Sequence, residues 1–278
     1  TNRLMKNIQL VGIDVDGTLV TSDKRITQET KDAFALAAKH NITTATCTGR
    51  TLCELEEICR ELPTMPYAVC NGGASVIDLH NHEIILQNSL DIDLVQKLYK
   101  IISKYDSLFE VFTLDYIWDD PAKLQNLEHF VLPDLQALVK KTRTPSPKPM
   151  ADFLETTSIK IDKIHVFFAS IPERDKAWKE IEHLPVFISA AEKNNLEICS
   201  NLANKGNGLL ALGRHLGLSV SQISAIGDSN NDIEMMKAAG YPVAVANANQ
   251  TIKDLSSFIT KSNDENGVAY FLHQLCGE

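Results

Sequence analysis

Two carboxylates, Asp14 and Asp16, lie two residues apart at the end of an apolar run, Ile8 to Val15, and Gly17 follows them. Such a run predicts a buried strand that ends in a sharp turn, and side chains at alternate positions of a strand share a face. Two neighbouring carboxylates are costly to bury unless a cation or a proton compensates them. We therefore expect chemistry here: one carboxylate attacks, the other moves protons, and a divalent metal balances the charge.

Three other polar segments stand at the ends of predicted elements. Thr46-Cys-Thr-Gly-Arg50 ends a second apolar strand, Asn204-Lys-Gly-Asn-Gly208 opens a helical pattern, and Gly227-Asp-Ser-Asn-Asn-Asp232 ends a later strand. In open parallel sheets, ligands bind outside the carboxyl ends of the strands. The strand pattern therefore predicts that four residues cluster there: Asp14, Thr48, Asn71 and Asp228.

Strand and helix patterns alternate in both end regions of the chain, which predicts a parallel sheet with helices on both faces. The first region is expected to form the helix Gln28 to His40 capped by Thr27, the strand Thr43 to Cys47, the helix Leu52 to Leu62, the strand Tyr67 to Cys70, and a hairpin of Val76 to Leu79 with Glu83 to Leu86. The second is expected to form the helices Gly206 to Leu216, Asn231 to Ala239, Thr251 to Leu255 and Gly267 to Leu275, and the strands Ile223 to Ile226, Val243 to Val245 and Phe258 to Thr260.

The segment between these regions, residues 89–192, has a different texture. It begins with an amphipathic helix, Leu94 to Tyr105, and contains two strand patterns, Phe109 to Trp118 and Ile164 to Ala169. We expect an inserted α+β domain at 89–192 and a discontinuous sheet domain at 1–88 and 193–278, with linkers near Asn88 and Lys193.

Composition narrows the class of protein. The chain has 278 residues, 44% of them hydrophobic, which suffices for one large or two ordinary domains. A formal net charge of −9 argues against nucleic acid as a main partner, but not against a small anionic substrate. The short N-terminus is polar, no apolar run nears the roughly 20 residues of a membrane span, and the six cysteines form no C-x-x-C pair. We expect a cytoplasmic protein with free, buried thiols.

Taken in order, the four polar segments resemble the four motifs of the haloacid-dehalogenase superfamily of phosphohydrolases. The Cof-type subfamily, which has a large cap between the second and third motifs, is the best match, and the resemblance runs from about Ile8 to the C-terminal helix. It implies an α/β fold: a Rossmann-like core with a parallel sheet, and an inserted α+β cap that sets substrate specificity.

The resemblance also implies roles for four residues. Asp14 matches the nucleophile that forms an aspartyl-phosphate, and Asp16 matches the general acid and base, which dehalogenases and phosphonatases of the superfamily lack. Thr48, with the backbone N–H that follows it, matches the group that holds the transferring phosphoryl. Lys205 matches the cation that neutralises charge there.

Metal and substrate residues follow from the same resemblance. Mg²⁺ prefers hard oxygen ligands, and the implied metal set is Asp14, Asp16 through its backbone carbonyl, Asp228, Ser229 and Asp232. The implied phosphate and substrate set is Val15, Thr48, Gly49, Arg50, Asn71, Lys205 and Asn231. Asp232 supports either Lys205 or a metal-bound water.

Several alternatives stay open at the level of sequence. Thr48 is also suited to cap the helix from Leu52, and Arg50 to pair with an acidic neighbour. Four residues either line the cap's substrate surface or only form a strand and its end: Tyr116, Trp118, Asp119 and Asp120. The predicted activity is Mg²⁺-dependent hydrolysis of a small-metabolite phosphomonoester, such as a sugar phosphate or a phosphorylated cofactor. A phosphomutase of the same superfamily and a non-catalytic phospho-metabolite sensor are the competing hypotheses. The protein is expected to be a monomer or a homodimer.

Overall fold

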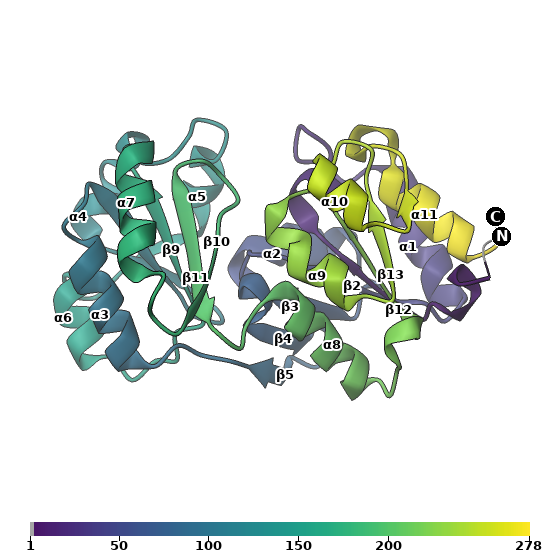
Figure 1. The fold of residues 1–278 in the computed structure, drawn as a ribbon, viewed down its shortest axis with the longest axis horizontal. Coiled ribbons are helices and arrows are strands. Elements are labelled where there is room, and N and C mark those ends of the chain that lie inside the picture. The colour runs from purple at the N-terminus through teal and green to yellow at the C-terminus, as the bar shows by residue number, and fades with distance from the viewer. Residues whose placement is uncertain (1–2) are drawn as a thin grey trace. The chain divides into compact units, whose positions relative to one another are not determined.

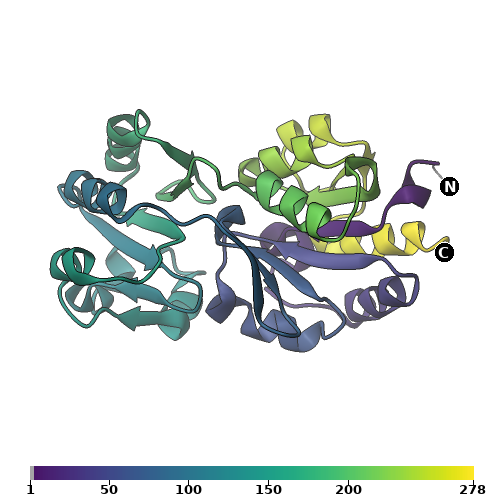
Figure 2. The same cartoon turned by 90° about the horizontal axis from the view of Figure 1, so that it is seen from below.

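The computed structural model describes residues 3–278; residues 1 and 2, part of the expected polar N-terminal segment, lie outside the described residues. The chain forms two compact units (Figures 1 and 2). Among the described residues, the larger unit comprises 3–49, Leu55–Gln87 and Asn204–Glu278, and the smaller unit comprises Arg50–Glu54 and Asn88–Ala203.

The larger unit is built on an eight-stranded sheet in the order β14-β13-β12-β1-β2-β3-β4-β5. Its strands are β1 (Leu10–Ile13), β2 (Thr43–Cys47), β3 (Tyr67–Cys70), β4 (Ser75–Asp78), β5 (Glu83–Gln87), β12 (Ile223–Gly227), β13 (Tyr241–Ala244) and β14 (Phe258–Ile259). All neighbours pair in parallel except β3–β4 and β4–β5. The chain leaves β1 toward β2 on one side and returns as β12 on the other, so a topological switch point lies beside β1.

Two helical layers cover this sheet, as the sequence pattern predicts. The helices α1 (Gln28–Lys39) and α11 (Gly267–Leu275) pack together, while α8 (Lys205–His215), α9 (Ile233–Ala238) and α10 (Gln250–Leu255) pack in series (Figure 1). The helix α2 (Leu52–Glu61) begins in the smaller unit and continues in the larger one. The Thr27 hydroxyl caps α1 by accepting from the Thr30 amide, as expected.

The smaller unit contains a six-stranded sheet in the order β10-β11-β9-β6-β7-β8. These strands are β6 (Ser107–Phe112), β7 (Ile117–Asp119), β8 (Arg143–Pro145), β9 (Lys163–Phe168), β10 (Val186–Ser189) and β11 (Asn195–Ser200). Its helices are α3 (Ile92–Ile102), α4 (Pro121–Leu124), α5 (Gln136–Thr142), α6 (Met150–Thr156) and α7 (Ile171–Ile181). The fold is thus α/β with an α+β insert, as expected.

Charged residues of the smaller sheet lie on one of its two faces, beside an apolar cluster that includes Leu108 and Phe167. One face joins α3, α6 and α7 in an apolar core that includes Val111, Val166 and Ile198. Strand register places Glu110 beside His165, and His165 beside Glu197, on the opposite face. Trp118 packs against the core through Phe153, so it does not share the face of these charged residues.

The structure corrects three expectations about the insert. The predicted strand Phe109 to Trp118 is two antiparallel strands, because the Thr113 hydroxyl accepts from the Tyr116 amide and closes a turn. Strand β11 was not predicted, since polar residues interrupt its apolar pattern. The smaller unit therefore extends to Ala203, and the expected linker at Lys193 lies inside it, between β10 and β11.

Within residues 3–278, no helix combines the length and apolar character needed to cross a membrane. All six cysteines are free, as expected, but only Cys47, Cys70 and Cys199 are buried. The other three are partly exposed, so the expectation of burial holds for half of them.

Candidate active site

Four predicted site residues follow the carboxyl ends of adjacent strands in the larger unit. Asp14 follows β1, Thr48 follows β2, Asn71 follows β3, and Asp228 follows β12. Backbone hydrogen bonds join these ends: the Asp14 amide donates to Ile226, and the Thr48 carbonyl accepts from Gly72 at 2.9 Å. The sheet therefore brings the first, second and fourth predicted motifs to one edge.

The third motif joins this edge through the first residue of α8. The Lys205 ammonium lies 3.0 Å from Asp14 Oδ1 and 2.9 Å from Asp232 Oδ1, and its side chain is 3% exposed. A lysine at a helix N-terminus is mildly unfavourable on its own. The contacts with the buried carboxylates of Asp14 and Asp232 offset that cost and stabilise the ammonium of Lys205.

Two glycines allow the loops of the site to approach each other. Gly17 has φ +77°, and a Cβ there would lie 2.3 Å from Asp228 Oδ2. Gly73 has φ +100°, and a Cβ there would lie 1.9 Å from the Asn204 carbonyl oxygen at the start of α8. Both positions therefore require glycine for conformation and for space.

Asp232 and Asp228 are oriented by their own hydrogen bonds. Asp232 Oδ2 accepts from the amides of Asp228 (3.0 Å) and Ser229 (3.3 Å), while Asp232 Oδ1 accepts from Lys205. Asp228 Oδ1 accepts from the Thr18 hydroxyl at 3.0 Å. Of the two alternatives for Asp232, support of Lys205 is the one with a direct contact.

The three aspartates Asp14, Asp228 and Asp232 repel one another, and Lys205 is the cation that opposes this repulsion. Burial raises the pKa of Asp14 well above its usual range, and the nearby Asp232 and Asp228 raise it further, while Lys205 opposes them. Burial likewise raises the pKa of Asp228. Each of the three aspartates offers a carboxylate oxygen, and these oxygens lie within 4.8 Å of one another. Hard oxygen donors at this spacing fit Mg²⁺.

Asp16 lies differently from Asp14. Strand β1 ends at Ile13, and the chain then winds through a turn from Val15 to Leu19, so the strand alternation that predicted a shared face does not apply. The Asp16 side chain is 45% exposed and forms an ion pair with Lys24 at 3.2 Å. The expectation of two buried carboxylates on one face was therefore wrong for Asp16.

The remaining predicted residues make mostly local contacts. The Val15 amide donates to Asp14 Oδ1 at 2.9 Å, and the Ser229 hydroxyl donates to Asn231 Oδ1 at 2.8 Å. Asn71 is buried with φ +53°, and its Nδ2 donates to Ser75. Arg50 belongs to the smaller unit and donates to the backbone carbonyl of Glu54.

Thr48 is buried, and the N-cap position of α2, the residue before Leu52, is Thr51 rather than Thr48. Sequence reasoning missed two polar partners of the site. Thr18, which orients Asp228, directly follows Gly17, so its place in the motif was a usable signal. Lys24, the partner of Asp16, carries no such signal.

Comparison with known proteins gives a consistent result. Residues 11–272 match the model of the haloacid dehalogenase-like hydrolase family. Two relatives from Bacillus subtilis, each 29% identical over 96% of this chain, are 5-amino-6-(5-phospho-D-ribitylamino)uracil phosphatase YwtE, with 98% of its length covered, and phosphatase YwpJ, with 100% covered.

Solved structures agree on the fold. A haloacid dehalogenase-like hydrolase from B. subtilis superimposes with a TM-score of 0.86 at 25% identity, over 96% of this chain and all of that one. A similar hydrolase from Bacteroides thetaiotaomicron gives 0.82 at 23% identity over 96% and 99%, and a sugar phosphatase of subclass IIB gives 0.80 at 18% identity over 96% and 98%.

Proposed function

The chain belongs to the haloacid dehalogenase-like hydrolase family and is one of its Cof-type phosphatases, and from this premise we propose that it hydrolyses phosphomonoesters of small metabolites with Mg²⁺. The observation that carries the proposal is the buried contact of Lys205 with both Asp14 and Asp232, beside Asp228. Three carboxylates in the loops after two strands and one ammonium at the start of α8 match the charge pattern needed for phosphoryl transfer.

Asp14 is assigned as the nucleophile. Its Oδ1 accepts from Lys205 and from the Val15 amide, so Oδ2 is the oxygen assigned to attack phosphorus. The new bond makes an aspartyl-phosphate as the bond from phosphorus to the leaving oxygen breaks. Water then attacks the phosphorus of this mixed anhydride, which releases phosphate and restores the Asp14 carboxylate.

Asp16 is assigned as the acid and then the base. It gives a proton to the leaving oxygen in the first step and takes one from the attacking water in the second. Its partial exposure suits both transfers, because its carboxyl is accessible to a leaving group and to solvent. Lys24, its partner, is then a competing contact that the side chain must release.

The other predicted residues are assigned to hold the phosphoryl group and to neutralise its charge. Thr48 and the Gly49 amide are assigned to the phosphoryl oxygens, with Asn231 beside them, and Lys205 balances their charge. Asp14, Asp228 and the Asp16 carbonyl are assigned to Mg²⁺, with Ser229 and Asp232 nearby; the ion supplies positive charge that stabilises the transferring phosphoryl. The smaller unit is assigned as the cap that selects the leaving group.

The decisive experiment measures phosphate release from a panel of phosphorylated metabolites with Mg²⁺. The panel includes sugar phosphates and 5-amino-6-(5-phospho-D-ribitylamino)uracil, for which two relatives are named. Asp14→Asn should abolish release, whereas Asp254→Asn, the same change at an exposed position of α10, should leave it unchanged. Release by a folded Asp14→Asn variant at the parent's rate would refute the proposal.

Two outcomes of the same assay would point to the competing functions. Dependence on an activating sugar bisphosphate, with the phosphoryl group returned to a sugar, would indicate a phosphomutase. Binding of a phosphorylated metabolite without any release by the parent protein would indicate a sensor.

A further inference from the structure

A short segment directly after Thr48-Gly49 belongs to the smaller unit, although the residues on both sides of it belong to the larger unit. This segment is Arg50–Glu54. The side chain of Thr51 is fully buried, and its hydroxyl lies 3.0 Å from the carbonyl oxygen of Thr113 and 2.8 Å from that of Leu114. The turn between β6 and β7 thus holds the segment at its second residue.

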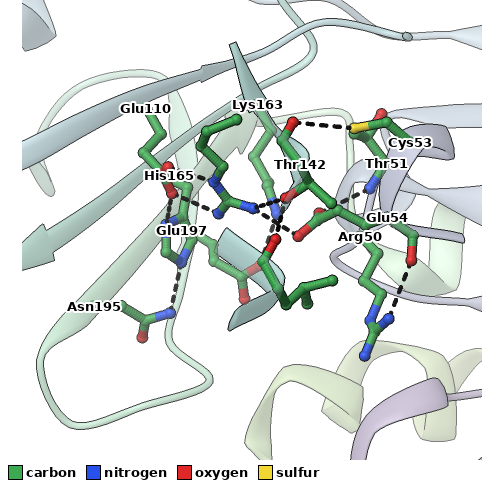
Figure 3. Close-up of polar contacts among 12 residues, drawn as sticks. Arg50, Thr51, Cys53, Glu54, Glu110, Thr142, Lys163, His165, Asn195 and Glu197 are labelled. Carbon is green, nitrogen blue, oxygen red and sulfur yellow. Dashed lines mark hydrogen bonds and ion pairs between the residues drawn. The ribbon is translucent and has the colours of Figure 1, made fainter. Parts of the chain in front are cut away.

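A second attachment is ionic and buried. Arg143 Nη1 donates to Glu54 Oε2 at 2.9 Å, and the same guanidinium makes a bidentate pair with Glu110, with Nε at 2.6 Å and Nη2 at 2.7 Å. Figure 3 labels the two carboxylates, Glu54 and Glu110. The side chains of Arg143, Glu54 and Glu110 are 3%, 7% and 0% exposed. Bidentate guanidinium–carboxylate pairs fix geometry as well as charge.

Glu110, the partner of Arg143, is itself held by residues of neighbouring strands. Glu110 also accepts from His165 Nδ1 at 3.0 Å, and His165 Nε2 lies 2.9 Å from Asn195 Nδ2. An amide donor on Nε2 leaves the proton on Nδ1, directed at Glu110. Burial raises the pKa of Glu110, but Arg143 and His165 outweigh that effect and hold it well below its usual range, so Glu110 stays ionised.

The distance along the chain from these attachments to the proposed phosphoryl-binding residues is small. Thr51 is three steps along the chain from Thr48, a reach of at most about 10–11 Å. The Thr48 backbone is fixed at the other end, where its amide donates to Val69 and its carbonyl accepts from Gly72, both at 2.9 Å. Displacing Thr51 or Glu54 must therefore change the path of Gly49 and Arg50.

We propose that Arg143 is a positioning residue for phosphoryl transfer. It holds Glu54, whose Oε1 accepts from the Thr51 amide at 3.3 Å, and through these contacts it sets the path of the Thr48-Gly49 segment. This inference rests on the proposed function, because it concerns the residues assigned there to hold the phosphoryl oxygens. A displacement of about 1 Å at a reacting group can lower a rate by about 100-fold. The expected effect of releasing the segment is thus on kcat and on phosphate affinity.

The test compares two buried glutamates of the smaller unit. Glu54→Gln weakens the contact with Arg143 while Glu110 still pairs with that guanidinium. Glu197→Gln is the matched control, because the Glu197 side chain is 9% exposed and pairs with Lys163 at 2.9 Å on the same sheet, so the change likewise removes the charge of a buried, ion-paired glutamate. Both variants are measured for Tm, for kcat and KM on p-nitrophenyl phosphate, and for the Ki of inorganic phosphate.

We expect Glu54→Gln to lower kcat by about 10- to 100-fold and to raise the Ki of phosphate, while Glu197→Gln changes either value by less than about threefold at a similar loss of Tm. Arg143→Lys, which keeps the charge but not the bidentate pair, should be intermediate between the parent and Arg143→Gln. If Glu54→Gln is poorly folded, Thr51→Val removes the hydroxyl contact at constant shape and should show the same pattern.

Coupling to Thr48 supplies an independent check. In a protein that already carries Thr48→Ala, Glu54→Gln should lower kcat by a smaller factor than it does in the parent. The reason is that the Thr48 hydroxyl, one of the groups that Glu54→Gln would misplace, is already absent. Equal factors in both backgrounds, or equal losses for Glu54→Gln and Glu197→Gln, would overturn the inference. Either result leaves the parent an active phosphatase, whereas the proposed function fails only if the parent releases no phosphate or Asp14→Asn remains active.

Discussion

Removing the proposed nucleophile should make the metal-free protein more stable while it abolishes turnover. In Asp14→Asn, a neutral amide replaces a carboxylate that lies 3.0 Å from Lys205 and within 4.8 Å of the carboxylate oxygens of Asp228 and Asp232. With an effective dielectric constant of about 20, the attraction to Lys205 is about 5.5 kcal/mol, and each repulsion is at least about 3.5 kcal/mol. The repulsions together, about 7 kcal/mol, exceed the attraction.

The difference, about 1.5 kcal/mol before the cost of burial is added, corresponds to a rise in Tm of about 3–6 °C. The sign of the pH dependence follows from the raised pKa of Asp14. A carboxyl with a higher pKa in the folded protein binds more protons when folded, so the free energy of unfolding increases as pH falls through that pKa toward the unfolded value near about 3.9. The parent should therefore gain stability from pH 8 to pH 5, and Asp14→Asn should gain less.

The assay is a set of thermal melts of both proteins in EDTA and in MgCl₂, at pH 8 and pH 5. In MgCl₂ the order should reverse or the gap should close, because bound ligand stabilises the parent more than a variant that lacks one carboxylate. A lower Tm for Asp14→Asn than for the parent in EDTA at pH 8 would refute the reasoning. It would mean that the contact with Lys205 outweighs the repulsion and burial.

Three other predictions follow from the same structure. Asp16→Asn should lower kcat by about 10²–10⁴-fold, as is typical for loss of a general acid and base, and a loss below tenfold at the optimal pH would remove Asp16 from that role. Excess EDTA should abolish phosphate release, Mg²⁺ should restore it and Ca²⁺ should not, since Ca²⁺ prefers more ligands at longer distances; full activity in EDTA would contradict the metal site. Burial and then Glu110 raise the pKa of Asp119, so Asp119→Asn should raise Tm at pH 8 and do so less at pH 5, where the parent's Asp119 is closer to being protonated; a lower Tm at both values would contradict this.

The sequence was sufficient to predict the arrangement of the larger unit and the clustering of its polar strand ends. Asp14, Thr48, Asn71 and Asp228 each follow a short apolar run, and parallel pairing aligns the ends of such runs. These features depend on local pattern and on one topological rule, so a single sequence carries them. Lys205 was identified instead by the resemblance of Asn204-Lys-Gly-Asn-Gly208 to a motif of the superfamily.

The parts that were not predicted depend on contacts between distant residues. Glu54 and Arg143 are separated by 89 positions, and nothing near either residue indicates the pair. Strand β11 was missed because Asn195 and Glu197, which face the charged side of the smaller sheet, interrupt its apolar pattern. The exposure of Asp16 was missed because the strand before it ends earlier than its apolar run suggests.

The discontinuity of the larger unit has a consequence for biosynthesis. Asp14 and Lys205 meet across 191 positions of the chain, and β1 cannot gain β12 as a neighbour until residues 223–227 have been made. The smaller unit, by contrast, consists of segments that all precede Asn204. Domains generally fold as units during synthesis, so the smaller unit is able to fold while the larger sheet is still unfinished. A nascent or truncated chain that stops before α8 therefore lacks Lys205 and Asp228 together, and only a chain that extends past Asp232 contains every residue of the proposed site.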